Sequence, residues 1–254
     1  IIKKYNSYDS EIDKLLKREI DNYTEIKRPF IPKFYGTIKY KDRCYPVIEF
    51  INGTTFQNTD FSQFNETEIY EIVLQMLLVI NYLHNNHFIY RDLKPNNAII
   101  DKNKTFVLID FDRMIKDNEN TKTKDNEDAK TMDFSSPYMA PEVKSNQIIN
   151  NKCDIFSVGK MIYFLLTKKQ KSIKNYTNTI LYQIFEQCIV NNTEHRPHSS
   201  KLVNDFIYFI RMYNINIIKA IYYFFLATNQ NYPQAQYNLG DIYYLGEYIS
   251  RDIN

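Results

Sequence analysis

Three short motifs, in a fixed order and close together, constrain the fold of this chain most strongly. The first, at residues 90–97, reads Y-R-D-L-K-P-N-N, and the second is D-F-D at residues 110–112. Between them, the apolar run at 105–109 is typical of a short buried strand. The third motif, Y-M-A-P-E, occupies residues 138–142. One such motif arises easily by chance, but three in order within about fifty residues indicate parts of one site.

Together the three motifs resemble the catalytic core of eukaryotic protein kinases, of the Ser/Thr type and of the tyrosine-kinase-like or a related group. The first matches H-R-D-L-K-x-x-N with Tyr90 in place of His, and the second matches D-F-G with Asp112 in place of Gly. The third contains A-P-E without change. The competing interpretation is a solvated polar turn followed by an Asp at a strand end. The resemblance implies an α+β fold of two lobes, a small β lobe and a mainly helical large lobe.

The resemblance also implies a role for four side chains. Asp92 would accept or orient the proton of a substrate hydroxyl, and Lys94 would reach the transferring phosphate of ATP. Asn97 and Asp110 would hold Mg²⁺, which prefers oxygen ligands and usually takes only one or two from the protein. The expected cofactors are therefore ATP and Mg²⁺. Lys94 favours Ser/Thr phosphorylation, because tyrosine kinases usually carry a different loop at this place.

The start of the chain resembles the strand that ends in the ATP-binding lysine of kinases. Ile2-Lys3 matches the end of V-A-I-K, and Glu19, within a helix-like stretch at 9–26, would be the partner of Lys3. The alternative is that both are ordinary solvated charges. No glycine-rich loop precedes Lys3, so we expect that loop and the first strands to lie upstream of residue 1. A degenerate kinase without the loop is the other interpretation.

Residues 44–53 resemble the strand and hinge that bind adenine in kinases. Ile48 would be the gatekeeper, and backbone groups of Glu49 and Ile51 would bond the base. Ile99 and Ile109 would pack against adenine from the large lobe. Plain core packing explains the same apolar residues, and for Ile99 and Ile109 both roles are compatible, since such a pocket extends the core.

The large lobe carries three further predictions. Segment 66–85 has apolar residues at helical spacing and should lead into the catalytic loop. Asp154, in D-I-F-S-V-G, resembles the Asp that anchors the backbone of that loop. Glu142 should pair with Arg196 as the buried ion pair of the family. The last two roles are structural rather than catalytic.

After about residue 211 the resemblance to kinases ends. Residues 218–228 and 235–246 combine small residues with Tyr and Leu at helical spacing, which resembles SEL-type repeats, relatives of the tetratricopeptide repeat. We therefore predict a kinase domain at 1–211 and the start of a helical repeat array at 212–254. One repeat cannot bury its own face, so further repeats are expected after residue 254. The alternative is a lone helical hairpin packed on the kinase.

Composition limits the partners and the compartment. The net charge of +2 points to neither nucleic acid nor a membrane surface, and no apolar run reaches the length that spans a bilayer. Three cysteines, far apart and odd in number, form no metal or disulfide pattern and suit a reducing cytosol. We therefore expect a cytoplasmic protein whose partners are protein substrates and proteins bound by the repeats.

Two functions of different classes fit the sequence. The leading one is a protein Ser/Thr kinase whose repeats recruit partners. The alternative is a pseudokinase scaffold that binds partners and transfers nothing. Tyr90 and, above all, Asp112 motivate the scaffold, because Asp is less permissive in backbone dihedral angles than Gly. The presence of every other expected catalytic residue favours catalysis.

The activation segment at 110–142 raises two further expectations. Arg91 resembles the Arg that grips a phosphate on this segment, and phosphorylation of Thr121, Thr123 or Thr131 would then order it. A solvated loop without a switch is the alternative. Ser135 stands where Ser/Thr kinases carry a Thr that contacts the catalytic Asp and Lys, so 135–142 should line the peptide groove.

Overall fold

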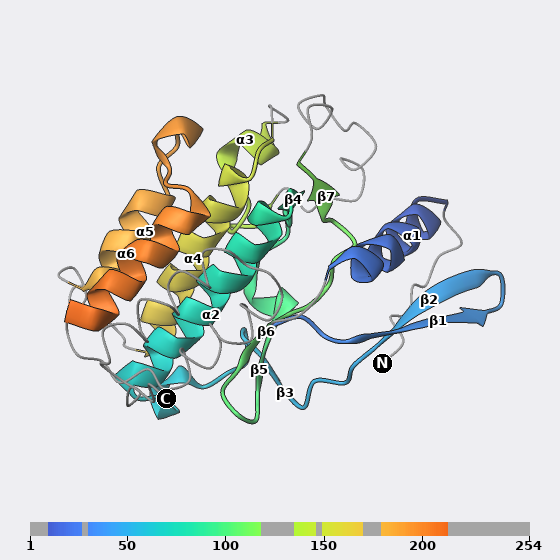
Figure 1. Ribbon diagram of the computed structural model, residues 1–254, viewed down its shortest axis with the longest axis horizontal. Coiled ribbons are helices and arrows are strands. Elements are labelled where there is room, and N and C mark those ends of the chain that lie inside the picture. The colour runs from blue at the N-terminus through green and yellow to red at the C-terminus, as the bar shows by residue number, and fades with distance from the viewer. Residues whose placement is uncertain (1–9, 27–29, 118–134, 146–148, 170–178, 213–254) are drawn as a thin grey trace, which may run out of the picture.

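The computed structural model of the 254-residue chain describes residues 10–26, 30–117, 135–145, 149–169 and 179–212. One end is small and contains α1 (Ser10–Glu25) beside a hairpin of β1 (Phe34–Tyr40) and β2 (Arg43–Ile48) (Figure 1). The two strands are antiparallel, and α1 packs against them. An ion pair of 2.7 Å between Arg43 Nε and Asp13 Oδ1 joins the helix to the hairpin. The small end is therefore one helix resting on one two-stranded sheet.

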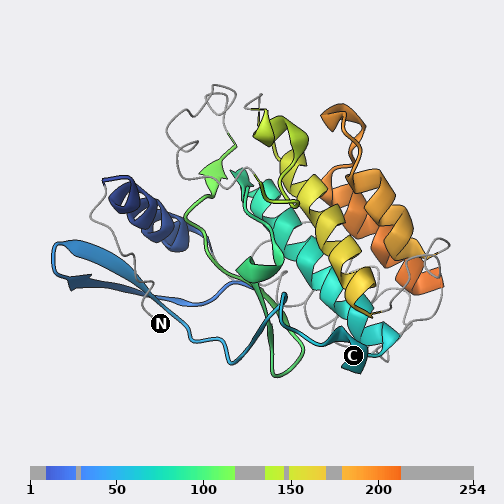
Figure 2. The same cartoon turned by 180° about the vertical axis from the view of Figure 1, so that it is seen from behind.

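The other end is helical. α2 (Glu66–Asn85), α4 (Lys152–Lys169), α5 (Ile180–Cys188) and α6 (Ser199–Met212) lie side by side, and the short α3 (Pro141–Lys144) lies at one end of the group (Figures 1 and 2). α2 packs on α4 and α6, and α4 packs on α5. These helices bury the apolar core of the large part.

Short strands connect the two ends. β3 (Gly53–Thr55), β5 (Ala98–Asp101) and β6 (Phe106–Leu108) form an antiparallel sheet in the order β3-β5-β6. β4 (Phe88–Ile89) pairs with β7 (Ile115–Lys116). Three short 3₁₀ helices complete the described elements: η1 (Phe61–Gln63), η2 (Pro95–Asn97) and η6 (Thr193–His195). The loops between β4 and β5 and between β6 and β7 hold two of the sequence motifs, so this sheet region places them together.

The start and burial of α2 follow from its sequence. Asn65 Oδ1 accepts from the backbone N–H of Glu68 at 2.9 Å, and Glu68 Oε2 accepts from the backbone N–H of Asn65 at 3.0 Å. This capping box satisfies two N–H groups that have no partner inside the helix. Gln75, fully buried on α2, accepts the backbone N–H of Phe106 at 2.6 Å and so fixes β6 against the helix.

The expected buried ion pair is confirmed. Arg196 Nη1 and Nη2 donate to Glu142 Oε1 and Oε2 at 2.6 and 2.9 Å. Both side chains are almost completely buried, and Arg196 also donates to the backbone carbonyls of Val190 and Lys152. A two-pronged charged pair of this kind fixes α3 to the segment before α6.

The described architecture agrees with the expected mixed α/β fold of two parts. The helices predicted at 9–26 and 66–85 are confirmed as α1 and α2. Lys3, Thr121, Thr123, Thr131 and the repeats predicted at 212–254 lie outside the described residues, apart from Met212 at the end of α6. In the part of the chain that the structure describes, no helix has the length and apolar character to cross a membrane.

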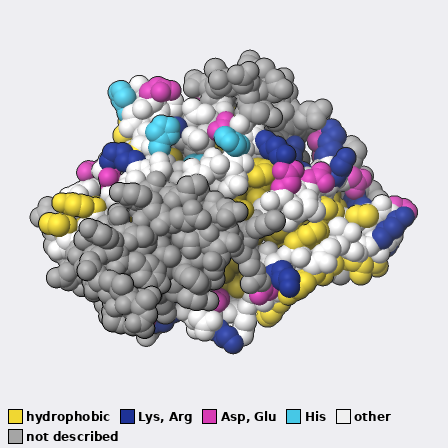
Figure 3. Space-filling view, viewed as in Figure 1, with side chains coloured by type: hydrophobic (Ala, Val, Ile, Leu, Met, Phe, Trp, Pro, Cys, Tyr) yellow, Lys and Arg dark blue, Asp and Glu magenta, His cyan; other side chains and the backbone are white. Residues whose placement is uncertain are grey.

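Hydrophobic side chains lie on the surface of the small end, over the β1–β2 hairpin, beside charged side chains over α1 (Figure 3). Tyr35, Ile38, Tyr40 and Val47 are the large apolar residues exposed on these strands. The hairpin therefore exposes several large apolar side chains to solvent.

Candidate active site

The loop between β4 and β5 holds Asp92 between two donors. Lys94 Nζ lies 2.9 Å from Asp92 Oδ1 and 2.8 Å from Oδ2. Asn97 Nδ2 donates to Asp92 Oδ2 at 2.7 Å and to the Asp92 backbone carbonyl at 3.0 Å. The loop bends sharply just before Asp92, where Arg91 has a φ of 68°. The carboxylate is thus fixed in one orientation by its own loop.

Competing effects act on the pKa of Asp92. Burial raises the pKa above the usual value for Asp, because it disfavours the charged form. The ammonium of Lys94 and the amide of Asn97 lower it, while the nearby carboxylate of Asp112 raises it again. The net direction is upward, which suits a group that takes up a proton.

Asp154 fixes the backbone of this loop, as the sequence predicted. Its Oδ2 accepts from the Tyr90 N–H and its Oδ1 from the Arg91 N–H, both at 2.8 Å. His84 Nε2 lies 2.9 Å from Asp154 Oδ2, and His84 Nδ1 lies 3.1 Å from Ser199 Oγ. Asp154 has no exposed surface, so α4 holds the catalytic loop through buried hydrogen bonds.

Asp110 follows β6 and reaches the same site through a sharp backbone turn. Its φ is 67°, a left-handed conformation that is uncommon for residues other than glycine. The Ile109 N–H donates to the Asn97 carbonyl at 3.0 Å, which sets Asp110 beside the catalytic loop. The Tyr90 hydroxyl donates to the Ile109 carbonyl at 2.5 Å. Burial raises the pKa of Tyr90 well above its usual range, so the hydroxyl keeps the proton that it donates.

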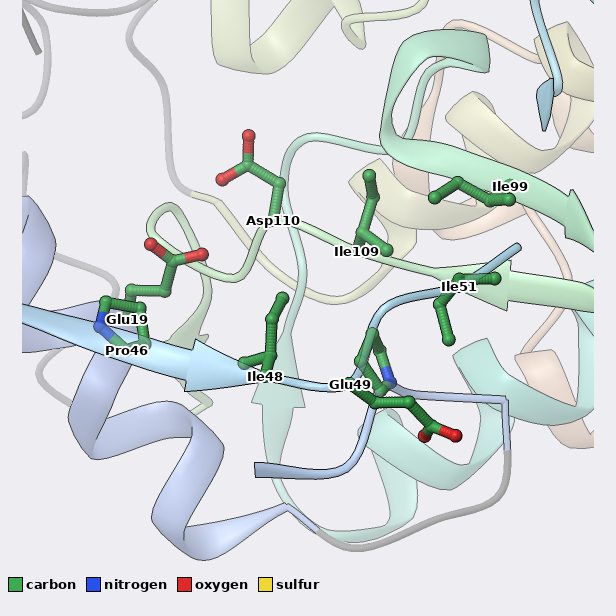
Figure 4. A pocket seen from close by; sticks show the side chains of 9 residues that line it. Glu19, Pro46, Ile48, Glu49, Ile51, Ile99, Ile109 and Asp110 are labelled. Atoms are coloured by element: carbon green, nitrogen blue, oxygen red, sulfur yellow. The ribbon is translucent and has the colours of Figure 1, made fainter. Parts of the chain in front are cut away.

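A pocket of about 180 Å³ opens between the two parts of the molecule, next to Asp110. Figure 4 shows Glu19 and Asp110 toward one side of it and the isoleucine side chains along its walls. Its lining comes from separate segments of the chain: Glu19, Pro32, Pro46, Ile48, Glu49, Ile51, Ile99, Ile109 and Asp110. A largely apolar pocket with carboxylates at one side suits a flat base whose phosphates extend toward a cation.

The pocket unites the described residues predicted to bind ATP. Glu19, buried on α1, comes from the small part; Ile99 lies on β5, and Ile109 directly follows β6. The Glu49 N–H already donates to the Lys33 carbonyl at 2.8 Å, so this N–H is engaged within the protein. The predicted partner of Glu19, Lys3, lies outside the described residues.

Sequence reasoning missed Pro32 and Pro46, which also line the pocket. A signal existed for Pro46, because it lies two residues before Ile48 on β2 and therefore on the same face of the strand. No comparable signal existed for Pro32, which precedes β1 and lies outside any strand. The Tyr90 hydroxyl bond was also missed, since a Tyr in the first motif indicates only a buried ring.

The residues present fit a magnesium ion. Asn97 donates through its amide nitrogen, so its amide oxygen is the atom that can bind a cation, and Asp110 supplies a carboxylate beside it. Two oxygen donors are what Mg²⁺ commonly takes from a protein when phosphates supply the rest. Glu19, Asp92, Asp110 and Asp112 make the region acidic, so a triphosphate needs a cation to enter it.

Asp112, the residue in the place of the family glycine, lies in a turn and does not have the positive φ angle that favours glycine. Positive φ angles at described residues other than glycine occur at Arg91 and Asp110 in this region, and not at Asp112. The Met114 N–H donates to the Phe111 carbonyl at 3.3 Å, which places Asp112 inside a four-residue turn. Turns of the commonest type accept most residues at their central positions. The restriction expected from losing glycine is therefore absent in this conformation.

Ser135 is exposed and is the first residue described after 118–134 in the activation segment. Its expected contact with Asp92 and Lys94 stays a prediction. Further along, Ser157 Oγ on α4 donates to the Tyr138 carbonyl at 2.8 Å and fixes the end of that segment.

Comparison with known proteins agrees with this geometry. A sequence model of the protein kinase domain family matches residues 1–216. The dual specificity protein kinase zak2 of Dictyostelium discoideum is 26% identical over 200 residues, which cover 75% of this chain and 31% of that protein. An Aurora kinase of Debaryomyces hansenii is 27% identical over 171 residues, 66% of this chain and 40% of that protein.

A third relative is the serine/threonine-protein kinase SIK1 of Mus musculus, 32% identical over 171 residues. The match covers 65% of this chain and 21% of that protein. The chain thus spans less than half the length of each of these relatives.

Proposed function

Since this chain belongs to the protein kinase domain family, we propose that it transfers the γ-phosphate of ATP to Ser or Thr hydroxyls of proteins. The observation that carries the proposal is the arrangement around Asp92. A partly buried carboxylate with a raised pKa is held by Lys94 and Asn97 on the loop beside Asp110. This arrangement meets the two needs of phosphoryl transfer, which are positioning and charge neutralisation.

In the proposed reaction Asp92 orients the substrate hydroxyl and accepts its proton. Lys94 supports the transferring phosphate with its positive charge while it keeps Asp92 in place. Asn97 and Asp110 hold Mg²⁺, which neutralises phosphate charge when it is bound. The adenine occupies the pocket formed by Ile48, Ile51, Ile99 and Ile109, and bonds the backbone of Glu49 and Ile51. Glu19, with Lys3, orients the α- and β-phosphates.

The choice of Ser and Thr over Tyr is part of the proposal. Lys94 supports it, and so do the printed names of several relatives, which are serine/threonine-protein kinases. The relative zak2 is named as dual specificity, so phosphoamino acid analysis must decide. The pseudokinase scaffold is the second candidate function. The observation that favours it is Asp112 in the place of the family glycine. The turn conformation of Asp112 weakens this support, because the position does not require glycine.

The test is incubation of the full-length protein with labelled ATP, Mg²⁺ and generic protein substrates. Label on Ser or Thr supports the proposal. Label on Tyr alone contradicts the specificity. Absence of transfer, in protein that is stabilised by MgATP in a thermal-shift titration, favours the scaffold.

We further propose a cytoplasmic protein that recruits partners through residues 212–254 and any repeats that follow. Linked binding sites raise the effective concentration of a substrate without new contacts at the active site. Removal of residues 213–254 should spare phosphorylation of a generic peptide and reduce that of a physiological substrate. An equal loss for both would mean that this region supports the kinase fold instead.

A further inference from the structure

One side chain joins α1 to the loop that carries Asp110. Asn22, buried on α1, donates through Nδ2 to the Phe111 carbonyl at 2.7 Å and to the Met114 carbonyl at 3.0 Å. An amide NH₂ has two hydrogens, so both are used. The two acceptors are the first and last residues of the turn that follows Asp110, and the Met114 N–H also donates to the Phe111 carbonyl at 3.3 Å.

The same face of α1 contributes two more groups. Glu19 precedes Asn22 by three residues and lines the pocket together with Asp110. Tyr23 packs edge-on against the Phe111 ring at 5.1 Å, and Phe111 packs in the same way against Tyr90 at 5.5 Å. Residues three and four apart lie on one side of a helix, so a carboxylate, an amide and a ring all face the site.

The burial of the Asn22 side chain indicates what this position contributes to the structure. A polar group taken out of water costs free energy unless its hydrogen bonds are made inside the protein. An apolar side chain at position 22 would fill the space without that cost. The geometry therefore indicates that the two hydrogen bonds, and not the filled volume, are what this position contributes.

We propose that Asn22 is a positioning residue that fastens the Asp110 loop to α1, so that Glu19 and Asp110 keep their relative placement on the nucleotide. The part of this proposal that concerns catalysis rests on the proposed function. Its structural part, the fastening of the loop to α1, can be tested without any phosphoryl transfer.

The first test is hydrogen exchange of the ligand-free, full-length protein. Asn22→Leu keeps the approximate size and removes both donors, and Asp21→Leu on the exposed neighbouring position is the matched control. We expect exchange in 19–25 and 111–116 to be about tenfold faster in N22L, because two ordinary hydrogen bonds correspond to roughly one order of magnitude. Exchange in α2 should stay unchanged. Equal rates in N22L and wild type at 111–116 would overturn the proposal.

The second test separates positioning from general stability. N22L should bind adenosine as tightly as wild type does, because the base pocket is intact. It should bind MgATP about tenfold more weakly and need more Mg²⁺ for half-saturation, because the loop of Asp110 is loosened. Equal losses for adenosine and MgATP would show a merely structural role. If N22L does not fold, Asn22→Ala takes its place with the same expectations. If the wild-type protein binds MgATP but transfers no phosphate, the proposed function is wrong. The proposed positioning role of Asn22 is not affected by that result.

Discussion

The pKa of Asp92 depends on its burial, on the cation Lys94 and on the neighbouring anion Asp112. Burial and Asp112 raise its pKa, and Lys94 and Asn97 lower it. A general base works only when ionised, so in the proposed reaction this balance sets the pH below which phosphoryl transfer is lost. Substitutions of the side chains around Asp92 should therefore shift the pH profile of phosphoryl transfer in a predictable direction.

Lys94→Met should lower kcat and shift the acidic limb of the pH profile to higher pH. Removing the ammonium takes away an effect that lowers the pKa of Asp92, so the carboxylate is protonated at a higher pH. Loss of one charged donor at a transition state reduces kcat by about 10²-fold or more. Initial rates against pH check both effects. Lys104→Met, at the surface pair with Glu68, is the control and should leave the profile in place.

Asp112→Gly should change kcat less than about threefold, because most residues suit the central positions of such a turn. The acidic limb of the pH profile should move to lower pH, because Asp112 raises the pKa of Asp92. Added backbone freedom in the unfolded chain should cost about 0.5–1 kcal/mol of stability, measurable by urea denaturation. A gain of tenfold or more in kcat would show instead that Asp112 impairs the enzyme.

At the scale of elements, helical spacing predicted α1 and α2, and the apolar runs at 44–50 and 105–109 indicated β2 and β6. β4, β7, α5 and α6 were not predicted from the sequence. α2 was predicted because its apolar residues recur at helical spacing over 66–85. β4 and β7 have two residues each and exist only because they pair with each other. Contacts such as Asn22 to Phe111 join residues 89 apart. No local pattern indicates the partner of such a polar side chain.

The contact between α4 and α5 depends on a glycine. A Cβ at Gly159 would lie 2.7 Å from Cys188 Cβ and 3.0 Å from Ile189 Cγ2, so the helices would have to separate. Gly159→Ala should therefore lower the free energy of unfolding by about 1–3 kcal/mol, the usual range for an overpacked core. This loss should appear although alanine favours helices by about 1 kcal/mol over glycine.

Urea denaturation measures the effect, with Lys168→Ala on the exposed side of the same helix as the control. A stabilised G159A variant would mean that the two helices are less tightly packed than the structure indicates.

At the scale of the molecule, the candidate site was largely predictable because the resemblance to protein kinases assigns roles to residues that lie together in the structure. Ile48, Ile99 and Ile109 come from three strands or strand ends, and the structure brings them to one pocket with Glu19. Pro32 was not predictable, since its place in the pocket depends on how the segment after α1 lies against the hinge. The net direction of the Asp92 pKa also required the structure, because it depends on burial and on the distance to Lys94.

Asp92, in the function proposed above, serves catalysis in a site that binds MgATP. The most direct measurement compares wild type with Asp92→Asn, which keeps the shape of the side chain and removes the proton acceptor. Affinity for MgATP should agree within about threefold, while phosphoryl transfer to a protein substrate should fall by about 10²- to 10⁴-fold, the usual contribution of a general base. Equal transfer by the two proteins would contradict the account, and so would a wild type that binds MgATP and transfers nothing.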